Sequence, residues 1–288
     1  DMKYRTVLCG AVNDFCLSVE DVERCFKEYN QENSLISYIL GFSHEYTNSK
    51  EKIQQVAALS HKYKAPVFTH LSETEYEVST CKEKTGLSPA EYLCDLGVYD
   101  YGGGAFHCVH MSEHDLDLFK EKHLNIVTNP ASNLKLASGI APIQAMLQRN
   151  INVCLGTDGA ASNNCLDMFR EMFLVTGLAK YKNCDASAVD AYEVLKMATI
   201  NGAKALNLNC GVLEAGKLAD LIILDLHQPN MQPINNVAKN IVYSGSKSNV
   251  KCTMVNGKIL YEDGHFHVGF VIEALYDEVQ KRVERLMR

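Results

Sequence analysis

Four residues capable of acid–base or metal chemistry follow the carboxyl ends of predicted strands. His70 ends one predicted strand and Glu73 comes three residues later; His107 lies at the end of the next strand, and Asp158 follows a later one. In a parallel α/β barrel the carboxyl ends of all strands open on one face, so these side chains are expected to converge there. Each alone has an ordinary structural explanation, such as a histidine satisfied by a backbone carbonyl or by solvent. Their matching positions favour a shared site.

The residue types at this predicted site indicate metal-assisted hydrolysis. Imidazole and carboxylate groups bind divalent cations, and catalytic zinc keeps one open position for water. A metal-bound water ionises near neutral pH and becomes a nucleophile. Glu73, close to the metal without binding it, is suited to carry protons between that water and a nitrogen of the substrate.

The elements that must position these residues alternate between short apolar β-type runs and stretches of helical periodicity. This pattern is typical of βαβ units on a parallel sheet. The predicted strands are Arg5–Ala11, Ser37–Phe42, Val67–His70, Ala105–Val109, Ile126–Thr128 and Val153–Gly156. The predicted helices between them are Val19–Asn30, Lys50–Tyr63, Pro89–Leu96, Glu113–Lys122 and Pro142–Arg149.

Two more helices, Leu166–Lys180 and Ala188–Ala205, precede a change of pattern near residue 210. Short strands are then predicted at Gly211–Gly216, Asp220–Leu226, Asn240–Tyr243, Val250–Val255 and Lys258–Tyr261, with Asn256-Gly257 as a tight hairpin turn. Residues 270–288 place apolar side chains on one helical face. We therefore expect a barrel part over residues 1–210, a β appendage over 211–267 and a C-terminal helix over 268–288.

The composition limits the partners and the compartment. The chain has 288 residues, 47% hydrophobic and 22% charged, as in ordinary globular proteins. Its net charge of −7 argues against nucleic acid and favours a small-molecule substrate. No apolar run approaches the roughly 20 residues that cross a membrane, so no membrane association is expected. The 11 cysteines, odd in number and mostly in apolar runs, favour free thiols and a cytoplasmic location.

Longer motifs around the candidate residues resemble those of a known family. They are FTHLSE (Phe68–Glu73), FHCVH (Phe106–His110), NPASNLKLASGIAP (Asn129–Pro142), LGTDGAASNN (Leu155–Asn164), GVLEAGKLADLIILDL (Gly211–Leu226) and VNGKILYEDG (Val255–Gly264). The chain resembles the amidohydrolase superfamily, and within it the 5′-methylthioadenosine/S-adenosylhomocysteine deaminases and their chlorohydrolase-like relatives. The similarity extends from about residue 3 to residue 267.

This resemblance implies a role for each candidate residue. His70 and Asp158 would bind one divalent metal, Zn²⁺ before Fe²⁺, and Glu73 would be the proton shuttle. His107 would orient the attacking hydroxide or polarise the forming oxyanion, and His44 in the run HEYTNS would contact the substrate. The implied reaction is attack at C6 of an adenine-like ring, with Asp158 as the first proton acceptor and ammonia as the leaving group.

The chain also departs from the family. The family begins with part of a β-sandwich and a first barrel strand bearing a His-x-His pair, whereas the only such pair here, His265 and His267, lies past the barrel and is expected in a surface turn. We therefore expect an incomplete TIM-barrel-type (β/α)8 fold holding about strands 3 to 8. We also expect a truncated chain with weak or absent metal and impaired activity.

Two alternatives remain open on the sequence alone. One is a different activity in the same superfamily, a guanine deaminase or a triazine-type chlorohydrolase. The other is a non-catalytic barrel remnant, favoured by the missing ligand pair and opposed by His70, Glu73, His107 and Asp158.

An open barrel also predicts self-association. Such a barrel would leave the flanks of Arg5–Ala11 and Val153–Gly156 as unpaired edges, which are templates for pairing with another chain. We expect homo-oligomers, which the family resemblance also implies. Light scattering tests this, and a monodisperse monomer would contradict it.

Overall fold

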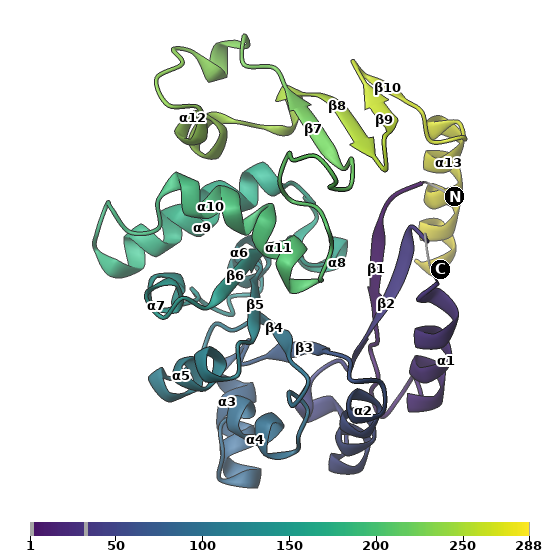
Figure 1. Ribbon diagram of the computed structural model, residues 1–288, viewed down its shortest axis with the longest axis vertical. Helices are drawn as coiled ribbons and strands as arrows, with labels where there is room; N and C mark the ends of the chain where they lie inside the picture. Colours follow the sequence, from purple (N-terminus) through teal and green to yellow (C-terminus); the bar gives the residue numbers. More distant parts are fainter. Residues whose placement is uncertain (1–2, 32–33, 288) are drawn as a thin grey trace.

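The computed structural model describes residues 3–31 and 34–287, and its main feature is a sheet of six parallel strands. The strands follow one another round a curled sheet in sequence order, with helices along its outside (Figure 1). They are β1 (Thr6–Cys9), β2 (Ile36–Gly41), β3 (Val67–Leu71), β4 (Gly103–His107), β5 (Asn125–Thr128) and β6 (Asn152–Leu155). All six predicted strands are confirmed. Within the described part of the chain, β1 and β6 are the two edges and do not pair with each other, so the sheet is a half-barrel.

The helices of this part of the chain lie between the strands or follow the last strand, β6. They are α1 (Val19–Tyr29), α2 (Lys50–Tyr63), α3 (Glu75–Thr85), α4 (Pro89–Asp95), α5 (Glu113–Glu121), α6 (Pro130–Lys135), α7 (Ile143–Gln148), α8 (Ala160–Asn163), α9 (Met168–Asn183), α10 (Ala191–Met197) and α11 (Ile200–Ala205). The side chain of Ser18 caps α1, and that of Ser88, followed by Pro89, caps α4. The helix expected over 188–205 is two helices, because the backbone at Thr199 leaves the helical region.

The sheet and its helices share one apolar core. The strands read as nearly continuous apolar runs because a parallel sheet is covered on both faces. Fully buried side chains from the strands include Leu40, Val67, Leu71, Ala105, Ile126 and Val153, and those from the helices include Ile53, Val56, Leu93, Leu116 and Phe119. Burying each large one contributes roughly 1.5–3 kcal/mol. This packing fixes the strand ends relative to one another.

A second, antiparallel sheet follows in the chain. It contains β7 (Leu221–Leu224), β8 (Val250–Val255), β9 (Lys258–Glu262) and β10 (His265–Phe266). The hairpin turn is confirmed, since Asn256 and Gly257 have φ of 50° and 74°. His265 and His267 are exposed, as expected, but His265 belongs to strand β10 rather than to the predicted turn.

Two predicted strands of this region are wrong. Residues 240–243 belong to α12 (Val237–Ser244), because the Asn236 side chain caps the helix and Ala238 and Val242, four residues apart, are buried beside α9 and α10. Residues 211–216 form turns rather than a strand, with both Gly211 and Gly216 at positive φ.

One ion pair connects the two sheets. Arg5, just before β1, donates to Asp220, just before β7, with an Nε to Oδ2 distance of 2.5 Å. Both side chains are mostly buried, and Asp220 also accepts the backbone N–H of Asn256. The Arg5 guanidinium is the main reason that the pKa of Asp220 lies below its usual range.

The β6 edge of the parallel sheet is covered, although the sequence predicts an open edge. Asn201 of α11 donates its side-chain amide to the carbonyl of Val153, and its own backbone carbonyl accepts the side-chain amide of Asn152.

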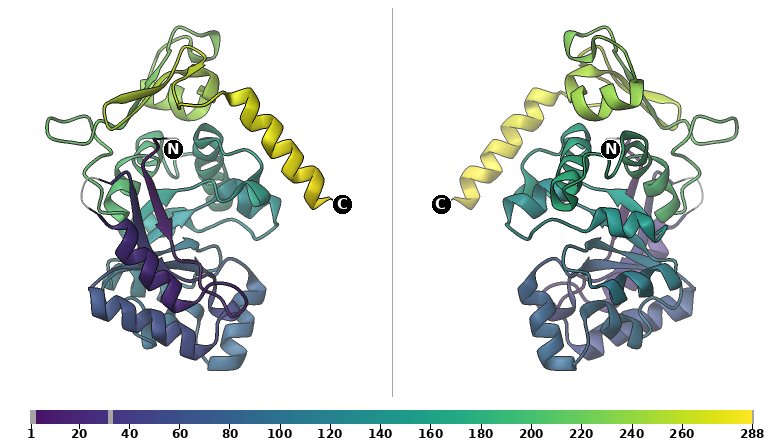
Figure 2. Two further views of the ribbon diagram at one scale, coloured as in Figure 1. Left: turned by 90° about the vertical axis from the view of Figure 1, so that its right-hand side faces the viewer. Right: turned by 90° about the vertical axis from the view of Figure 1, so that its left-hand side faces the viewer.

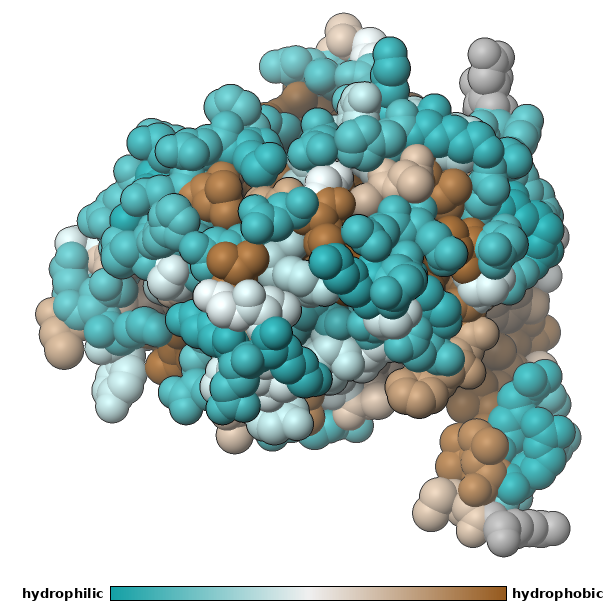
Figure 3. Space-filling view, turned by 90° about the horizontal axis from the view of Figure 1, so that it is seen from below, coloured by the Kyte–Doolittle hydropathy of each residue, from teal (hydrophilic) through white to brown (hydrophobic). Residues whose placement is uncertain are grey.

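The C-terminal helix α13 (Ile272–Leu286) is confirmed, but it extends away from the rest of the molecule without a buried residue (Figure 2). Seen from below, the surface is mostly hydrophilic with small separate hydrophobic areas (Figure 3). Among the described residues, no helix has the length and apolar character needed to cross a membrane.

Replacement of Gly103 should disrupt the pairing of β3 with β4. Gly103 has a φ of 140°, and a Cβ there would lie 2.0 Å from the carbonyl oxygen of Val67. We expect Gly103→Ala to lower the free energy of unfolding by roughly 3 kcal/mol or more. Gly102→Ala is the matched control, since Gly102 also has positive φ but has no atom within 4 Å of the added Cβ, and about 1 kcal/mol is expected. Equal losses in urea denaturation would contradict the steric argument.

Candidate active site

Three histidines from neighbouring strand ends form a stacked row. His70 lies in β3, His107 ends β4, and His44 follows β2 as the residue before the short helix η1 (Glu45–Thr47). The ring of His70 is 4.2 Å from that of His44 and 5.4 Å from that of His107, with interplanar angles of 12° and 21°. The convergence predicted from the sequence is confirmed for these side chains, because parallel strands in register bring their carboxyl ends together.

Glu73 lies between the two outer histidines of the row. Its Oε2 is 3.8 Å from His44 Nε2, its Oε1 is 3.8 Å from His107 Nδ1, and Oε1 also accepts from the Ser138 hydroxyl at 3.2 Å. The interaction with His44 is the main cause that lowers the pKa of Glu73 to about 2, and it outweighs the opposing effect of burial. Glu73 is therefore ionised at neutral pH.

Asp158 follows β6 and is held by its own neighbours. Its carboxylate accepts from the Ser132 hydroxyl at 2.5 Å and from the backbone N–H of Gly159 at 2.6 Å. Burial raises the pKa of Asp158, but these hydrogen bonds and the charge of His107 together hold it below its usual range. The carboxylate is thus ionised, and its hydrogen bonds go to the loop of β6 and to α6 rather than to the histidine row.

The protonation of two histidines suits them to bind a cation. His70 Nδ1 lies 2.8 Å from the carbonyl oxygen of Ser43, and His107 Nδ1 lies 2.7 Å from Oδ1 of Asn133, so these acceptors place a hydrogen on each Nδ1 and leave Nε2 of both rings facing away from these bonds. Burial, followed by the charge of His44, lowers the pKa of His70 to about 4, which keeps the ring neutral. A neutral imidazole fixed in this way is the form that ligates metals.

The described residues do not complete a metal site by themselves. Catalytic zinc normally has three protein ligands and a water. Within residues 3–31 and 34–287 no three His, Cys, Asp or Glu side chains are grouped so that they could hold a metal ion. The chemistry of His70 and Asp158 fits a divalent cation, whereas the number of ligands among the described residues does not.

Two supporting residues, Asn133 and Ser138, were not predicted as part of the site. Both lie in the motif Asn129–Pro142, which carried the family resemblance without a role for each residue. His110 fixes this segment, because its Nε2 lies 2.7 Å from the carbonyl oxygen of Ser138. The periodicity of the motif does not predict these contacts, because they depend on how the segment of α6 packs against the ends of β3 and β4.

Removing the charge of Glu73 should change the acid sensitivity of the fold. The folded-state pKa of about 2 lies below the ordinary 4.5, so Glu73 stabilises the fold above about pH 5, and this contribution is lost as the pH falls towards 2. We expect Glu73→Gln to lower the free energy of unfolding at neutral pH by about 1–2 kcal/mol, allowing for solvent screening, and to flatten its loss on acidification. Urea denaturation between pH 2 and pH 7 measures both.

The matched control is Glu75→Gln, which removes an exposed carboxylate two residues away. It should leave the acid profile of the wild type unchanged. Identical profiles for all three proteins would contradict the role assigned to the contacts of Glu73.

Comparison with known proteins places the chain among the amidohydrolases. The model of the amidohydrolase family matches residues 9–260. A 5-methylthioadenosine/S-adenosylhomocysteine deaminase of Caldanaerobacter subterraneus subsp. tengcongensis is 39% identical over 273 residues, which are 94% of this chain and 63% of that protein. A 5′-deoxyadenosine deaminase of Methanothermobacter thermautotrophicus is 40% identical over 260 residues, 90% of this chain and 61% of that protein. The chain thus spans about six tenths of the length of these curated relatives.

A solved structure shares the fold over nearly the whole chain. The crystal structure of an adenosine deaminase from Xanthomonas campestris with bound zinc superimposes with a TM-score of 0.94 at 30% identity, over 99% of this chain and 67% of that one. The curled parallel sheet, the strand-end histidines and the match of the family model agree, and the chain therefore belongs to the amidohydrolase family.

Proposed function

We propose that this chain carries part of the active site of a metal-dependent deaminase that releases ammonia from an adenine-type nucleoside. The observation that carries the proposal is the Glu73 carboxylate, held 3.8 Å from both His44 and His107, the two outer members of the row of stacked imidazoles. The names of the two curated relatives and of the Xanthomonas campestris structure, each a deaminase of an adenine nucleoside, favour this reaction over others of the family. Because the chain spans only part of their length, the proposal concerns the full-length protein.

In this proposal His70 and Asp158 bind the divalent metal, with Zn²⁺ favoured by the bound zinc of the Xanthomonas campestris structure and Fe²⁺ as the alternative. When bound, such an ion lowers the pKa of a water molecule so that it ionises near neutral pH. The fixed Nδ1–H bond of His70 to Ser43 keeps Nε2 available for the ion.

The other side chains handle protons and orientation. Asp158, ionised before the reaction, accepts the proton of the attacking water. The free Nε2 of His107 accepts a hydrogen bond from the same water and orients it, because Asn133 occupies Nδ1. Glu73 takes the other proton of that water and delivers it to the ring nitrogen of the base. The proton held by Asp158 passes to the amino group, which leaves C6 as ammonia, and His44 contacts the substrate.

The low pKa of Glu73 makes substrate binding part of this chemistry. A carboxyl group with a pKa of about 2 is a weak base at neutral pH, whereas a shuttle works best when its pKa lies near the working pH. A nucleoside that separates Glu73 from His44 and excludes water would remove the main cause of the lowered pKa. Without a bound base, Glu73 therefore stays ionised and does not donate a proton.

We also assign the protein to the cytoplasm, with a small molecule as its substrate. All eleven cysteines have free thiols, which suits a reducing compartment.

Ammonia release from a panel of substrates tests the proposed function. The zinc-loaded full-length protein should deaminate methylthioadenosine, adenosylhomocysteine, adenosine or 5′-deoxyadenosine in preference to guanine or a chlorinated triazine. Glu73→Gln and Asp158→Asn should each lower kcat by about 100-fold or more, because each removes a proton acceptor. Glu75→Gln is the control and should keep the wild-type rate. Preference for guanine or a triazine, or no turnover of any of them, would overturn the proposal.

A further inference from the structure

Glu77 holds the backbone on which Glu73 stands. It is the third residue of α3 and is 1% exposed. Its Oε1 accepts the backbone N–H of Ser72 at 2.5 Å and its Oε2 accepts that of Glu73 at 2.7 Å. In an ordinary capping box a glutamate at this position accepts the N–H of the capping residue, here Thr74. Glu77 instead reaches one and two residues further back, to the segment that carries the proposed proton shuttle.

The backbone of this segment needs such support. Ser72 has a φ of 50°, a left-handed conformation that is uncommon for a residue other than glycine. Its carbonyl oxygen accepts the N–H of His110, and its own N–H and that of Glu73 both point at the carboxylate of Glu77. Both oxygens of Glu77 are therefore engaged as acceptors of consecutive backbone N–H groups.

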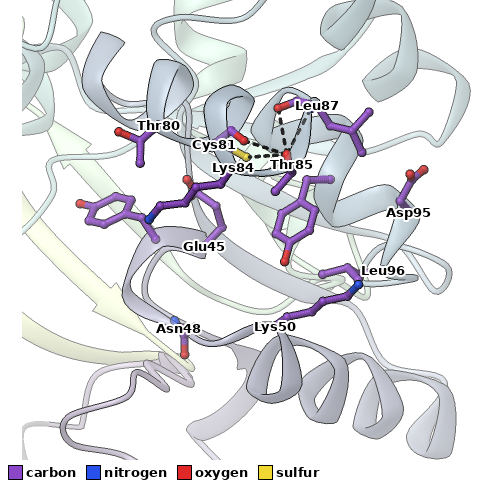
Figure 4. A pocket seen from close by; sticks show the side chains of 12 residues that line it. Glu45, Asn48, Lys50, Thr80, Cys81, Lys84, Thr85, Leu87, Asp95 and Leu96 are labelled. Atoms are coloured by element: carbon purple, nitrogen blue, oxygen red, sulfur yellow. Dashed lines mark hydrogen bonds between the residues drawn. The ribbon is translucent and has the colours of Figure 1, made fainter.

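Glu45 is the second buried carboxyl group beside this segment. It follows His44 as the first residue of η1, is 6% exposed, and lies between η1 and α3 (Figure 4). Both of its oxygens are buried, and among the described residues neither has a donor. Lys50 and Lys84 line the pocket next to it without bonding either oxygen. A buried carboxylate without any donor would be costly.

A proton on Glu45 removes the buried charge and with it the largest part of this cost. The short helix η1 packs against α3, which places Glu45 beside the helix that bears Glu77, so an O–H group on Glu45 could donate to the Glu77 carboxyl group. Burial is the main cause that raises the pKa of Glu45 to about 8, followed by the charge of Glu77. The two groups then share one negative charge and one proton, and every buried oxygen of Glu77 has a donor.

We propose that Glu45 and Glu77 form a buried acid–carboxylate pair that positions Glu73, by tying the loop that bears His44 to the segment that bears Glu73. Both are positioning residues, and neither touches the substrate. Glu45 follows His44 in the chain, and Glu77 accepts the backbone N–H of Glu73. A bond between Glu45 and Glu77 therefore holds the backbones of His44 and Glu73 together and fixes the 3.8 Å separation of their side chains. The effect on catalysis rests on the function proposed above, whereas the pair itself does not.

Two conservative variants separate this pair from a simple buried charge. In Glu45→Gln the side-chain N–H₂ replaces the acid O–H as donor to Glu77, so the segment should keep its conformation. In Glu77→Gln one acceptor oxygen becomes an N–H₂ group that faces a backbone N–H, so one of the two bonds must be lost. If the two groups were only buried charges without directed hydrogen bonds, both substitutions would change the conformation of the segment to the same degree.

Spectroscopy on the full chain tests the pair without reference to activity. The wild type at neutral pH should show the infrared carbonyl band of a protonated carboxyl group, shifted in D₂O and absent in Glu45→Gln. The amide proton resonances of Ser72 and Glu73 should keep their positions in Glu45→Gln and move in Glu77→Gln. A wild type without that band, or unmoved resonances in Glu77→Gln, would overturn the pair. If Glu77→Gln does not fold, the infrared band and Glu45→Gln still decide.

Kinetics of the zinc-loaded full-length protein test the positioning. Glu77→Gln should lower kcat by about tenfold or more with KM within about twofold, because a misplaced shuttle impairs proton transfer more than binding. Glu45→Gln and the control Glu75→Gln should keep the wild-type kcat. An unchanged kcat in a folded Glu77→Gln would overturn the positioning role. A wild type that shows the spectroscopic signs of the pair but no deaminase activity would overturn the proposed function and leave the pair standing.

Discussion

The parallel pairing of β2, β3 and β4 is the constraint on which the rest of the site depends. Strands of this sheet run in one direction and pair residue by residue, so that Leu71 lies opposite His107 and His70 opposite Phe106. The end of each strand therefore delivers its next side chain to the same rim. The stacking of His44, His70 and His107 follows from this pairing, as does the position of Glu73 beside them.

The charged side chains at this rim are stabilised by hydrogen bonds as well as by ion pairs. His70 and His107 each give a hydrogen to an oxygen acceptor from another element, which fixes both tautomers. Glu73 and Asp158 are both ionised because donors surround them despite partial burial. The neutral ring of His70 lies at the same rim as these two ionised carboxylates, a combination that suits a cation.

The sequence predicts the six-stranded sheet better than it predicts the hydrogen bonds around the strand ends. Short apolar runs between helical stretches identified all six parallel strands, because a covered parallel sheet leaves that pattern in the chain. Helix α3 was missed since only Glu77 and Cys81 of its residues are buried, so it has no apolar stripe. The error at residues 240–243 has a different cause: β-branched residues favour a strand locally, and burial against α9 and α10 overrides that preference. Contacts such as those of Asn133 and Ser138 depend on the tertiary placement of loops, which no local pattern records.

Three of the strand ends share an unusual backbone. Ser72, His107 and Asp158 have φ of 50°, 70° and 58°, although none of them is glycine. Each such residue costs on the order of 1 kcal/mol relative to an extended or helical conformation. These strained residues lower the stability of the fold at the candidate site, and packing in the core and the helices offsets that loss. Glycine at these positions would relieve the strain and free the backbone at once, so thermal robustness and a rigid rim are opposing demands on the same few residues.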